Sequence, residues 1–394
     1  MSTPESTVII GAGINGLSTA FYLARAQQHG NNIIVVDIAP DNLSAASAKA
    51  NGVLSDYNRV GPAADLAHLS WKLHQQLAVE HSGVVNWGYV KTVRHHLCNF
   101  GNESHGLVSQ YALPGWMRDR ERYLQEVTGN PYNCARLDPR KFATFLLQKC
   151  EEYGVSTSFE AEIGSVQLDQ QGVVAVVIED KDGAHRVDCR NLVVAAGAWS
   201  GRVIRKLFPE SRFQPRFDES HRSAGNWLII TTPRPSGSEY CHQVYVEGIA
   251  GIPVEISDYH DGRLYVGGYL AEAEPLPATP VEVEAQPVPI AEMASIASQF
   301  VDFKHGKPEI LETGRCYRPI LTDGRPIIAE IPTHTLTGRA YNAAHGARLR
   351  SGVFVNTGQG TSGICMGPGS GLVTSELIRG LQPSADISGL GIPK

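Results

Sequence analysis

The chain has 394 residues, and 34 Lys and Arg against 40 Asp and Glu give it a formal net charge of −6. A mildly acidic chain without a basic run lacks the electrostatic footprint of a nucleic-acid-binding protein. No apolar stretch reaches the roughly 18 residues of a membrane span, and the first residues lack the positive charge of a secretory signal. We therefore expect a cytoplasmic globular chain of two or three domains without a membrane partner, and the peroxisome stays open as its compartment. The seven scattered cysteines contain no CxxC pair and predict no metal site.

The first 37 residues predict a strand, a helix and a second strand. An apolar run from Thr7 to Ile10 is typical of a buried parallel strand. Residues 14–28 place apolar side chains at helical spacing, and a second apolar run extends from Ile33 to Val36. This order is that of a βαβ unit.

The turn into the predicted helix carries a GxGxxG motif, Gly11 to Gly16. Gly11 permits the tight turn, Gly13 lets a pyrophosphate approach the backbone, and Gly16 allows close packing of helix on strand. The helix N-terminus offers free N–H groups to that pyrophosphate. Asp37, at the end of the second strand, accepts hydrogen bonds from ribose hydroxyls and repels a 2′-phosphate. The unit therefore predicts a site for one dinucleotide other than NADP.

The rest of the chain alternates between helical and extended patterns. Asp138 and Pro139 are the N-cap and first residue of a predicted helix that Gly154 ends. The proline-rich segment 273–289 is expected to be an extended loop or lid. The other expected elements are a hairpin at 164–180, strands at 185–195, 226–232, 263–269 and 353–355, and helices at 290–303 and 370–380. The two ends of the chain suggest one parallel sheet, and the middle suggests an inserted antiparallel domain.

The loop Ser44–Gly52 is small and polar, and it directly follows the ribose-binding acid. Such a loop can lie along a diphosphate and a flavin ring, with a plain surface loop as the alternative.

Four further segments carry a resemblance. They are Asp188–Ser200 with its AAGAW turn, Gly262–Gly268, Tyr317–Pro326 and Gly358–Gly363. In this order, and together with the first βαβ unit, they resemble the D-amino-acid oxidase superfamily of flavoproteins, which includes glycine oxidase and sarcosine oxidase. The resemblance runs from residue 8 to about residue 380.

The resemblance implies an α/β fold: a Rossmann-like FAD-binding domain with an inserted antiparallel-sheet substrate domain. The expected FAD-binding domain collects residues 1–80, 138–216 and 310–394. The expected substrate domain collects residues 81–137 and 217–309.

The motifs and the resemblance together predict the residues that hold FAD. The glycine-rich loop Gly358–Gly363 is expected to aim its N–H groups at the flavin pyrimidine edge, where negative charge develops. The full predicted set is Gly11, Gly13, Ile14, Asn15, Gly16, Asp37, Ser47, Lys49, Ala50, Asn51, Gly52, Val166, Ala196, Gly197, Trp199, Cys316, Gly358, Gly360, Thr361, Ser362 and Gly363.

Three residues are candidates for the catalytic site. Arg318 matches the family arginine that pairs with a substrate carboxylate, for which its planar fork of donors is suited. Tyr245 and Tyr265 are expected to orient the substrate, with strand packing as the alternative. Cys316 matches the position at which the sarcosine-oxidase branch attaches its flavin, so covalent and non-covalent FAD both stay open. That branch also has an oxygen-activating lysine in the strand that matches residues 263–269. In this sequence, residues 263–269 contain no lysine.

The resemblance implies an FAD-dependent oxidase of a C–N bond in a primary or secondary amine, in the first place an amino acid. A hydride would pass to the flavin, giving an imine, and oxygen would be the acceptor, giving hydrogen peroxide. One alternative is an FAD-dependent 2-hydroxy-acid dehydrogenase that uses another acceptor. A second alternative is a flavin-binding regulatory protein without catalysis.

Overall fold

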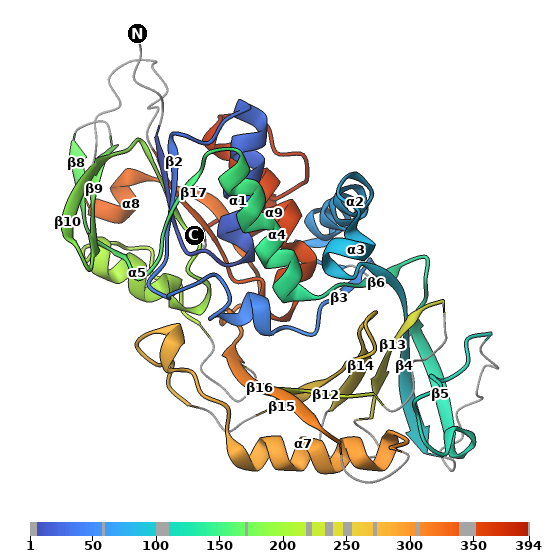
Figure 1. Cartoon of the computed structure of the whole chain (residues 1–394). Coiled ribbons are helices and arrows are strands. Elements are labelled where there is room, and N and C mark those ends of the chain that lie inside the picture. Colours follow the sequence, from blue (N-terminus) through green and yellow to red (C-terminus); the bar gives the residue numbers. More distant parts are fainter. Residues whose placement is uncertain are drawn as a thin grey trace.

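The computed structural model describes residues 6–56, 60–99, 110–169, 172–217, 223–232, 239–246, 254–270, 274–303, 308–338 and 352–392. Within these ranges the chain builds two large sheets, one in the upper and one in the lower part of Figure 1. Segments from both ends of the chain meet in the upper sheet, as the sequence predicts.

The upper sheet has six strands in the order β17-β18-β11-β1-β2-β7, and all but β17 run parallel. The expected strands at residues 7–10, 33–36 and 353–355 are confirmed within it. Its strands are β1 (Thr7–Ile10), β2 (Ile33–Val36), β7 (Ser156–Ser158), β11 (Asn191–Val194), β17 (Ile327–Ile331) and β18 (Gly352–Thr357).

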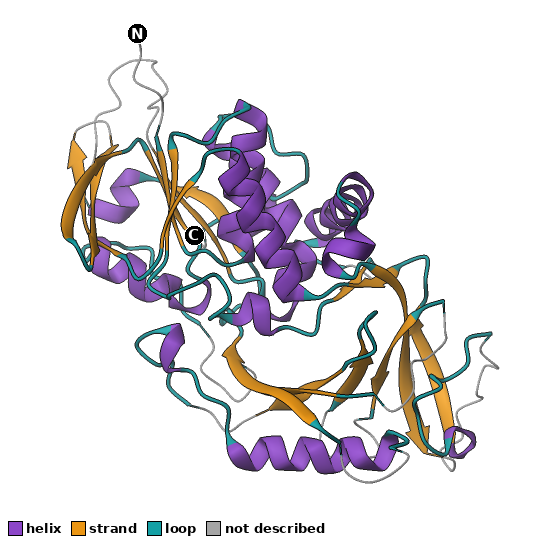
Figure 2. Cartoon of the chain, viewed as in Figure 1, coloured by secondary structure: helices purple, strands orange, loops and turns teal. Residues whose placement is uncertain are grey.

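Both faces of the six-stranded sheet are covered, which explains its continuously apolar strands. Ile9 faces the layer of α1 (Ile14–Gln27), α4 (Pro139–Glu152) and α9 (Gly363–Ile378). Val8 and Ile10 face a small antiparallel sheet on the other side, made by β8 (Glu162–Asp169), β9 (Gly172–Asp180) and β10 (Gly183–Asp188). Figure 2 shows these layers, with the helices on one side of the parallel strands.

The first helices begin where the sequence predicts. α1 spans Ile14–Gln27 and follows the GxGxxG turn directly. The side chain of Asp138 caps α4 by accepting hydrogen bonds from the backbone N–H groups of Arg140 and Lys141, at 3.0 and 3.3 Å. Gly154 follows the end of α4 with a φ of +84°, a left-handed conformation that favours glycine.

The last helix is longer than predicted. α9 begins at Gly363 rather than near residue 370, and it includes Pro368 and several glycines. A Cβ added to Gly367 would lie 2.4 Å from Cγ1 of Ile14, and one on Gly371 would lie 2.4 Å from Ser18. Residues that weaken an isolated helix are present here because α9 packs closely on α1.

The lower sheet has the strand order β16-β12-β15-β14-β13-β4-β6-β3, with β5 paired to β4. It is antiparallel except for the parallel pair β13 and β4. Its strands are β3 (Val53–Ser55), β4 (Val90–Asn99), β5 (Tyr123–Gly129), β6 (Cys134–Arg136), β12 (Ala224–Ile230), β13 (Cys241–Tyr245), β14 (Glu255–Asp258), β15 (Leu264–Leu270) and β16 (Ile310–Tyr317).

The two faces of the lower sheet differ in character. α7 (Pro287–Phe300) lies along its outer face, where Leu228, Val266 and Met293 share one apolar cluster (Figure 1). The inner face carries polar side chains and looks toward the upper sheet. The remaining helices are α2 (Ala64–Glu80), α3 (Gly83–Trp87), α5 (Ser200–Leu207) and α8 (Thr333–Thr337), with short 3₁₀ turns such as η1 (Ala46–Lys49).

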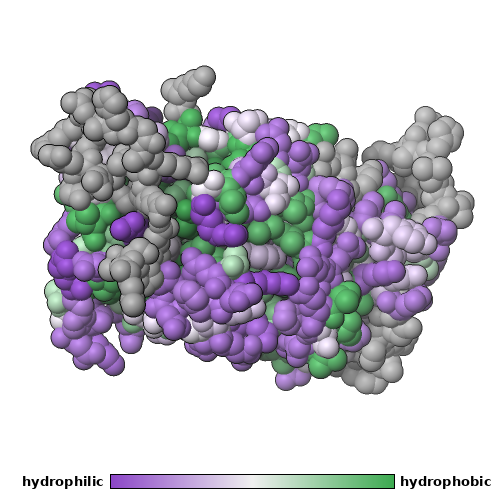
Figure 3. All heavy atoms as spheres, turned by 90° about the horizontal axis from the view of Figure 1, so that it is seen from above, coloured by the Kyte–Doolittle hydropathy of each residue, from purple (hydrophilic) through white to green (hydrophobic). Residues whose placement is uncertain are grey.

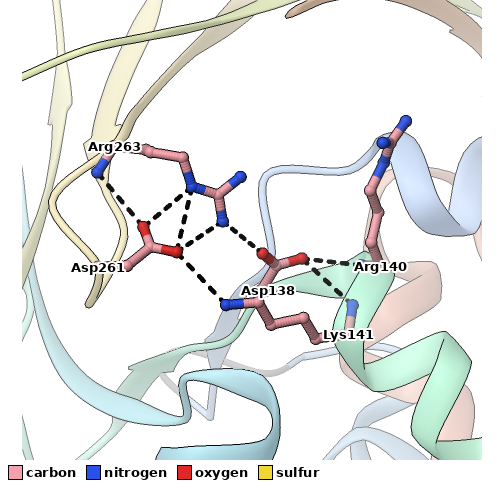
Figure 4. Close-up of polar contacts among 5 residues, drawn as sticks. All are labelled: Asp138, Arg140, Lys141, Asp261 and Arg263. Atoms are coloured by element: carbon pink, nitrogen blue, oxygen red, sulfur yellow. Dashed lines mark hydrogen bonds and ion pairs between the residues drawn. The ribbon is translucent and has the colours of Figure 1, made fainter. Parts of the chain in front are cut away.

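An ion-pair cluster joins the two sheets at the start of α4 (Figure 4). Nη2 of Arg263, from the β14–β15 hairpin, lies 2.7 Å from a carboxylate oxygen of Asp138. The same guanidinium binds Asp261, and Asp261 also contacts Lys141. The carboxylate that caps α4 therefore also holds the lower sheet.

Two of the expected FAD-binding segments contain strands of the lower sheet, because β3 within residues 1–80 pairs with β6 and β16 within residues 310–394 pairs with β12. The third FAD-binding segment is expected to begin at residue 310, but β16 hydrogen-bonds to β12 in the lower sheet. Only after Tyr317 does the chain return to the upper sheet. The division of the chain into two domains remains a proposal, with this boundary moved to about residue 318.

The outer surface is of ordinary mixed character. Seen from above, the face in Figure 3 is largely hydrophilic, with apolar side chains in separate groups. In the described ranges, no helix combines the length and the apolar character needed to cross a membrane.

Candidate functional site

A cleft of about 1240 Å³ lies between the two sheets, where the parallel strands of the upper sheet end. Ligands bind at this edge in open α/β sheets. Most of the predicted residues line the cleft: Gly11, Gly13, Ile14, Asn15, Asp37, Ser47, Lys49, Ala50, Asn51, Ala196, Gly197, Trp199, Tyr245, Tyr265, Cys316, Arg318, Gly358, Gly360, Thr361, Ser362 and Gly363.

Three predicted cofactor residues do not line the cleft. Gly16 lies behind it, where an added Cβ would be 1.9 Å from the carbonyl oxygen of Gly11. Gly52 makes a turn with a φ of +79°, against the carbonyl of Leu137. Val166, in β8, packs against the apolar cluster between β8 and the upper sheet. β8 lines the cleft only up to Ile163, and a register shift follows.

The N-terminus of α1 is shaped to receive an anion. Gly11 has a φ of +108°, and an added Cβ would lie 2.5 Å from the carbonyl oxygen of Ala195. Oγ of Ser47 accepts the hydrogen bond of the Ile14 N–H at 2.9 Å, so the 44–52 loop closes over the turn. At Gly13 an added Cβ would approach this oxygen to 3.2 Å. The turn thus presents bare backbone and a helix N-terminus to the cleft.

Asp37 is held in place at the end of β2. Its two carboxylate oxygens accept hydrogen bonds from the N–H groups of Ala12 at 2.6 Å and Ala39 at 2.9 Å. Burial raises the pKa of Asp37, and these two hydrogen bonds oppose that shift. Each oxygen keeps a lone pair that can accept from a hydroxyl group in the cleft.

The glycine-rich loop after β18 is tied to two neighbouring loops. Oγ1 of Thr357 donates to the carbonyl of Gly197 at 2.9 Å, and the N–H of Gly360 donates to the carbonyl of Pro319 at 3.1 Å. Gly358 has a φ of +88°, and an added Cβ would lie 2.4 Å from Leu321. The three loops therefore form one rigid wall of the cleft.

A buried chain of amides links this loop to the two central helices. Nδ2 of Asn15 donates to Gln359 at 2.6 Å, and Nε2 of Gln359 donates to Asn356 at 2.7 Å. Nδ2 of Asn356 then donates to Thr374 in α9 at 3.0 Å. Buried hydrogen bonds of this kind are costly to break, so they fix the relative position of α1, α9 and the loop.

Cys316 and Lys49 meet at the end of β16. Burial raises the pKa of the Cys316 thiol, and the nearby cations Arg318 and Lys49 oppose that shift. Burial lowers the pKa of Lys49. Lys49 comes from the 44–52 loop and brings an amine into the cleft. β15 contains no lysine that could do the same.

Arg318 lies above the neighbouring strand β12. Its Nη1 donates to the carbonyl of Ala224 at 3.2 Å, and an added Cβ on Gly225 would lie 2.3 Å from Nη2. Tyr265 is buried beside it and stacks on Trp227, with ring centroids 6.3 Å apart. Burial holds the pKa of Tyr265 well above its ordinary value, so its phenol stays protonated at neutral pH.

The predicted residues Tyr245 and Asn51 belong to a polar network on the lower sheet whose other members, Arg94, Gln243 and Glu255, were not predicted. Nε of Arg94 in β4 donates to Gln243 at 2.9 Å, and Gln243 donates to Glu255 at 2.6 Å and to the hydroxyl of Tyr245 at 3.0 Å. Nδ2 of Asn51 donates to the other oxygen of Glu255 at 2.6 Å. All five residues line the cleft. The alternation of polar residues in β13 is a local signal for this face, but it does not show which strands lie beside it.

Comparisons with known proteins agree with this geometry. A family model described as "DAO: FAD dependent oxidoreductase" matches residues 6–377. A Schizosaccharomyces pombe protein named as an oxidoreductase is 25% identical over 98% of this chain and 97% of its own length. Glycine oxidase of Bacillus licheniformis is 22% identical over 95% of this chain and 93% of its own. The crystal structure of glycine oxidase from Geobacillus kaustophilus superposes with a TM-score of 0.73, at 16% identity, covering 99% of this chain and 98% of that one.

The residues of the cleft fit the group that this family binds. The turn at Gly11 and Gly13 leaves the space that a Cβ would fill, and Asp37 stands at the end of the adjacent strand. The wall built by the 358–363 loop faces the same cleft from the other side. Because the family model matches residues 6–377, the chain belongs to the DAO family, and the protein is an FAD-dependent oxidoreductase.

Proposed function

We propose that the protein oxidises a C–N bond of a small amine that carries a carboxylate, an amino acid. The observation that carries the proposal is the position of Arg318, whose guanidinium lies over β12 at the cleft. A guanidinium there can pair with a carboxylate through two parallel hydrogen bonds and so orient the neighbouring carbon. The names of two relatives, both glycine oxidase, point to the same class of substrate.

The chain's own residues bind, orient and exclude water, and FAD supplies the acceptor for a hydride. Backbone N–H groups at the start of α1 would hold the diphosphate, and Asp37 would accept from a ribose hydroxyl. The protonated phenol of Tyr265 is a donor for the carboxylate that Arg318 holds. Tyr245 binds Arg94 and Gln243 instead and would orient the far end of the substrate.

The decisive experiment follows bleaching of the flavin absorbance without oxygen, for amino acids and for the matching amines without a carboxylate. We expect amino acids to bleach the flavin. Arg318→Gln should lower kcat/KM by a factor that corresponds to about 2–4 kcal/mol of lost transition-state stabilisation. Arg325→Gln is the matched control, because Arg325 pairs with Asp323 outside the cleft. An unchanged kcat/KM in Arg318→Gln, or equal turnover of the amines, would remove Arg318 from the substrate site.

A 2-hydroxy-acid dehydrogenase is the second candidate. The same guanidinium would hold the carboxylate of a hydroxy acid, and β15 lacks the lysine that the sarcosine-oxidase branch places there. Against this, Lys49 brings a cation into the cleft from another element. Bleaching by hydroxy acids together with dye reduction, but no hydrogen peroxide, would favour the dehydrogenase. The non-catalytic alternative is set aside, because the chain is a member of an oxidoreductase family.

We also propose Cys316 as the residue that decides whether FAD is covalently held. The thiol lines the cleft, and the charge of the nearby Lys49 favours its ionised form. Acid precipitation of the purified protein would leave a covalent flavin in the pellet, and Cys316→Ser would release it. Cys365→Ser is the control, because Cys365 also lines the cleft. A colourless pellet from the unmodified protein would exclude the covalent link.

A further inference from the structure

The inner face of the lower sheet carries three charged side chains in a row. Following the strand order β12-β15-β14-β13, the guanidinium of Arg318 lies over β12, Glu255 is on β14, and Arg94 lies beside β13. All three line the cleft, so a cation, an anion and a second cation face the same space. A ligand that complements the two guanidinium groups carries two acids.

Arg94 has the capacity for a ligand. Its guanidinium lies 5.6 Å from the ring centroid of Tyr245, and its hydrogen bonds go to neutral groups, Gln243 and the Tyr245 hydroxyl. Cys134 lies beside it as a further weak partner. A guanidinium has five N–H donors, so these contacts leave donors for the cleft. Among the residues that the structure describes, no carboxylate forms an ion pair with Arg94; the hydrogen-bond path to Glu255 runs through Gln243, and the charge of Glu255 acts on Arg94 from beyond contact distance.

Glu255 occupies the middle of the row. Its two oxygens each accept one hydrogen bond, from Asn51 and Gln243, both at 2.6 Å. Because it accepts from Nε2 of Gln243, whose Oε1 accepts from Arg94, it orients the amide that holds Arg94. Because Asn51 comes from the loop beside Lys49, the carboxylate is fixed between the two sheets.

The spacing of the arginines sets the size of the ligand. The guanidinium of Arg94 reaches from β4 to Gln243 and Tyr245 of β13. β13 is three steps from β12 in the sheet, which is about 14 Å at the usual strand separation. Two charge-assisted hydrogen bonds of about 2.8 Å leave about 8 Å between the outer carboxylate oxygens. An extended chain covers that span with about seven bonds from oxygen to oxygen, given about 3.8 Å for every three backbone bonds, and a six-carbon diacid has this separation.

We propose that Arg94, oriented by Gln243 and Glu255, forms a distal acid-binding subsite, and that the substrate is an amino acid in which about seven bonds separate the outer oxygens of two carboxylates, as in a six-carbon diacid. Arg318 holds the first carboxylate, Arg94 holds the second, and Glu255 fixes Gln243 beside Arg94. The claim that the substrate is oxidised at its amine rests on the proposed function. The claim that the cleft binds two acids does not depend on it.

The first test measures binding rather than turnover. Adipate and hexanoate have the same length and differ in one carboxylate, and calorimetry gives the affinity of each for the FAD-loaded protein. We expect adipate to bind about 10- to 150-fold more tightly, and Arg94→Gln to abolish that advantage. Lys91→Gln removes one exposed positive charge from the opposite face of β4, and in this control variant adipate should still bind more tightly than hexanoate. Equal affinities of the two acids for the unmodified protein would overturn the subsite.

The second test measures selectivity in the reaction. 2-Aminoadipate, norleucine and lysine share six carbons and end in an acid, a methyl group and an ammonium group. We expect kcat/KM to favour 2-aminoadipate, and Arg94→Gln to lower its ratio to norleucine by about 10- to 150-fold. Arg94→Lys keeps the charge and should retain part of the ratio, which separates recognition from misfolding.

The outcomes distinguish the two proposals. If norleucine is oxidised as well as 2-aminoadipate and the ratio does not respond to Arg94, the subsite is wrong and amine oxidation stands. If no amino acid bleaches the flavin while adipate binding depends on Arg94, the acid subsite stands and amine oxidation is wrong.

Discussion

Asp138 joins two interactions that a pair of substitutions can separate. Its carboxylate caps α4 through the N–H groups of Arg140 and Lys141, and it binds Arg263 at 2.7 Å across the two sheets. Loss of an N-cap costs about 1 kcal/mol. Loss of a charge-assisted hydrogen bond costs about 1.5 kcal/mol, at the low end of its range because Arg263 is 32% exposed and keeps Asp261.

We therefore expect Asp138→Ala to lower the free energy of unfolding by about 2.5 kcal/mol. Asp138→Asn keeps an acceptor for the cap and loses only the charge, so its cost is about 1.5 kcal/mol. Urea denaturation of the FAD-loaded protein, followed by tryptophan fluorescence, measures both. Amide exchange in the first turn of α4 should accelerate in the alanine variant and much less in the asparagine variant.

A double-mutant cycle with Arg263→Gln isolates the contact between the sheets. Asp138→Asn and Arg263→Gln should show a coupling energy of about 1 kcal/mol. A coupling near zero would show that Arg263 is satisfied by Asp261 alone. Equal costs for the alanine and asparagine variants would refute the assignment of a separate cap.

Three further predictions test the packing and the pH response. Gly371→Ala should destabilise by about 2 kcal/mol despite the better helix propensity of alanine, because its Cβ would overlap Ser18; a gain in stability on urea denaturation would contradict the packing of α9 on α1. Burial lowers the pKa of His74 to about 4, so the neutral form stabilises the fold above pH 6.5 and this contribution is lost as the pH falls from about 6.5 to about 4. The loss should reach about 3 kcal/mol, and a His74→Gln variant with the same pH dependence as the unmodified protein would refute it. Arg202 donates to the carbonyls of Leu276 and Pro277, so Arg202→Met should speed amide exchange at residues 274–283; unchanged exchange would show that other contacts hold the segment.

Local patterns predicted the parts of the site that lie next to each other in sequence. The turn from Gly11 to Gly16 carries its own geometry, because a left-handed φ and the absence of a Cβ are properties of single residues. The cap of α4 at Asp138 is likewise contained in adjacent residues. For these elements the chain's local chemistry and its final contacts agree.

The start of α9 was mispredicted for a physical reason. Pro368 and the glycines on either side of it oppose a helix in an isolated segment. The gain comes from the close approach of α9 to Ile14 and Ser18, which lie near the other end of the chain. A local propensity cannot include a contact of that sequence separation.

The same limit hides the distal part of the cleft. Arg94 meets Gln243 because β4 and β13 pair in parallel, with Gln243 directly opposite Arg94. Each residue alone is an ordinary polar residue of a strand with one exposed face. Only the pairing of the strands reveals Arg94, Gln243 and Glu255 as one group.

The layered order of the upper sheet has a consequence for synthesis of the chain. β1 needs β11 beside it, β11 needs β18, and α1 is covered by α9, so α1 acquires this cover only after about 340 further residues have been synthesised. At about 5 to 20 residues per second, the N-terminal βαβ unit waits roughly 20 to 70 s for α9. During that interval an apolar helix face stays exposed on the ribosome-bound chain. We therefore expect truncations that remove α9 to give aggregated or degraded protein rather than a smaller FAD-binding unit. Stable folding of the N-terminal βαβ unit then depends on synthesis of α9.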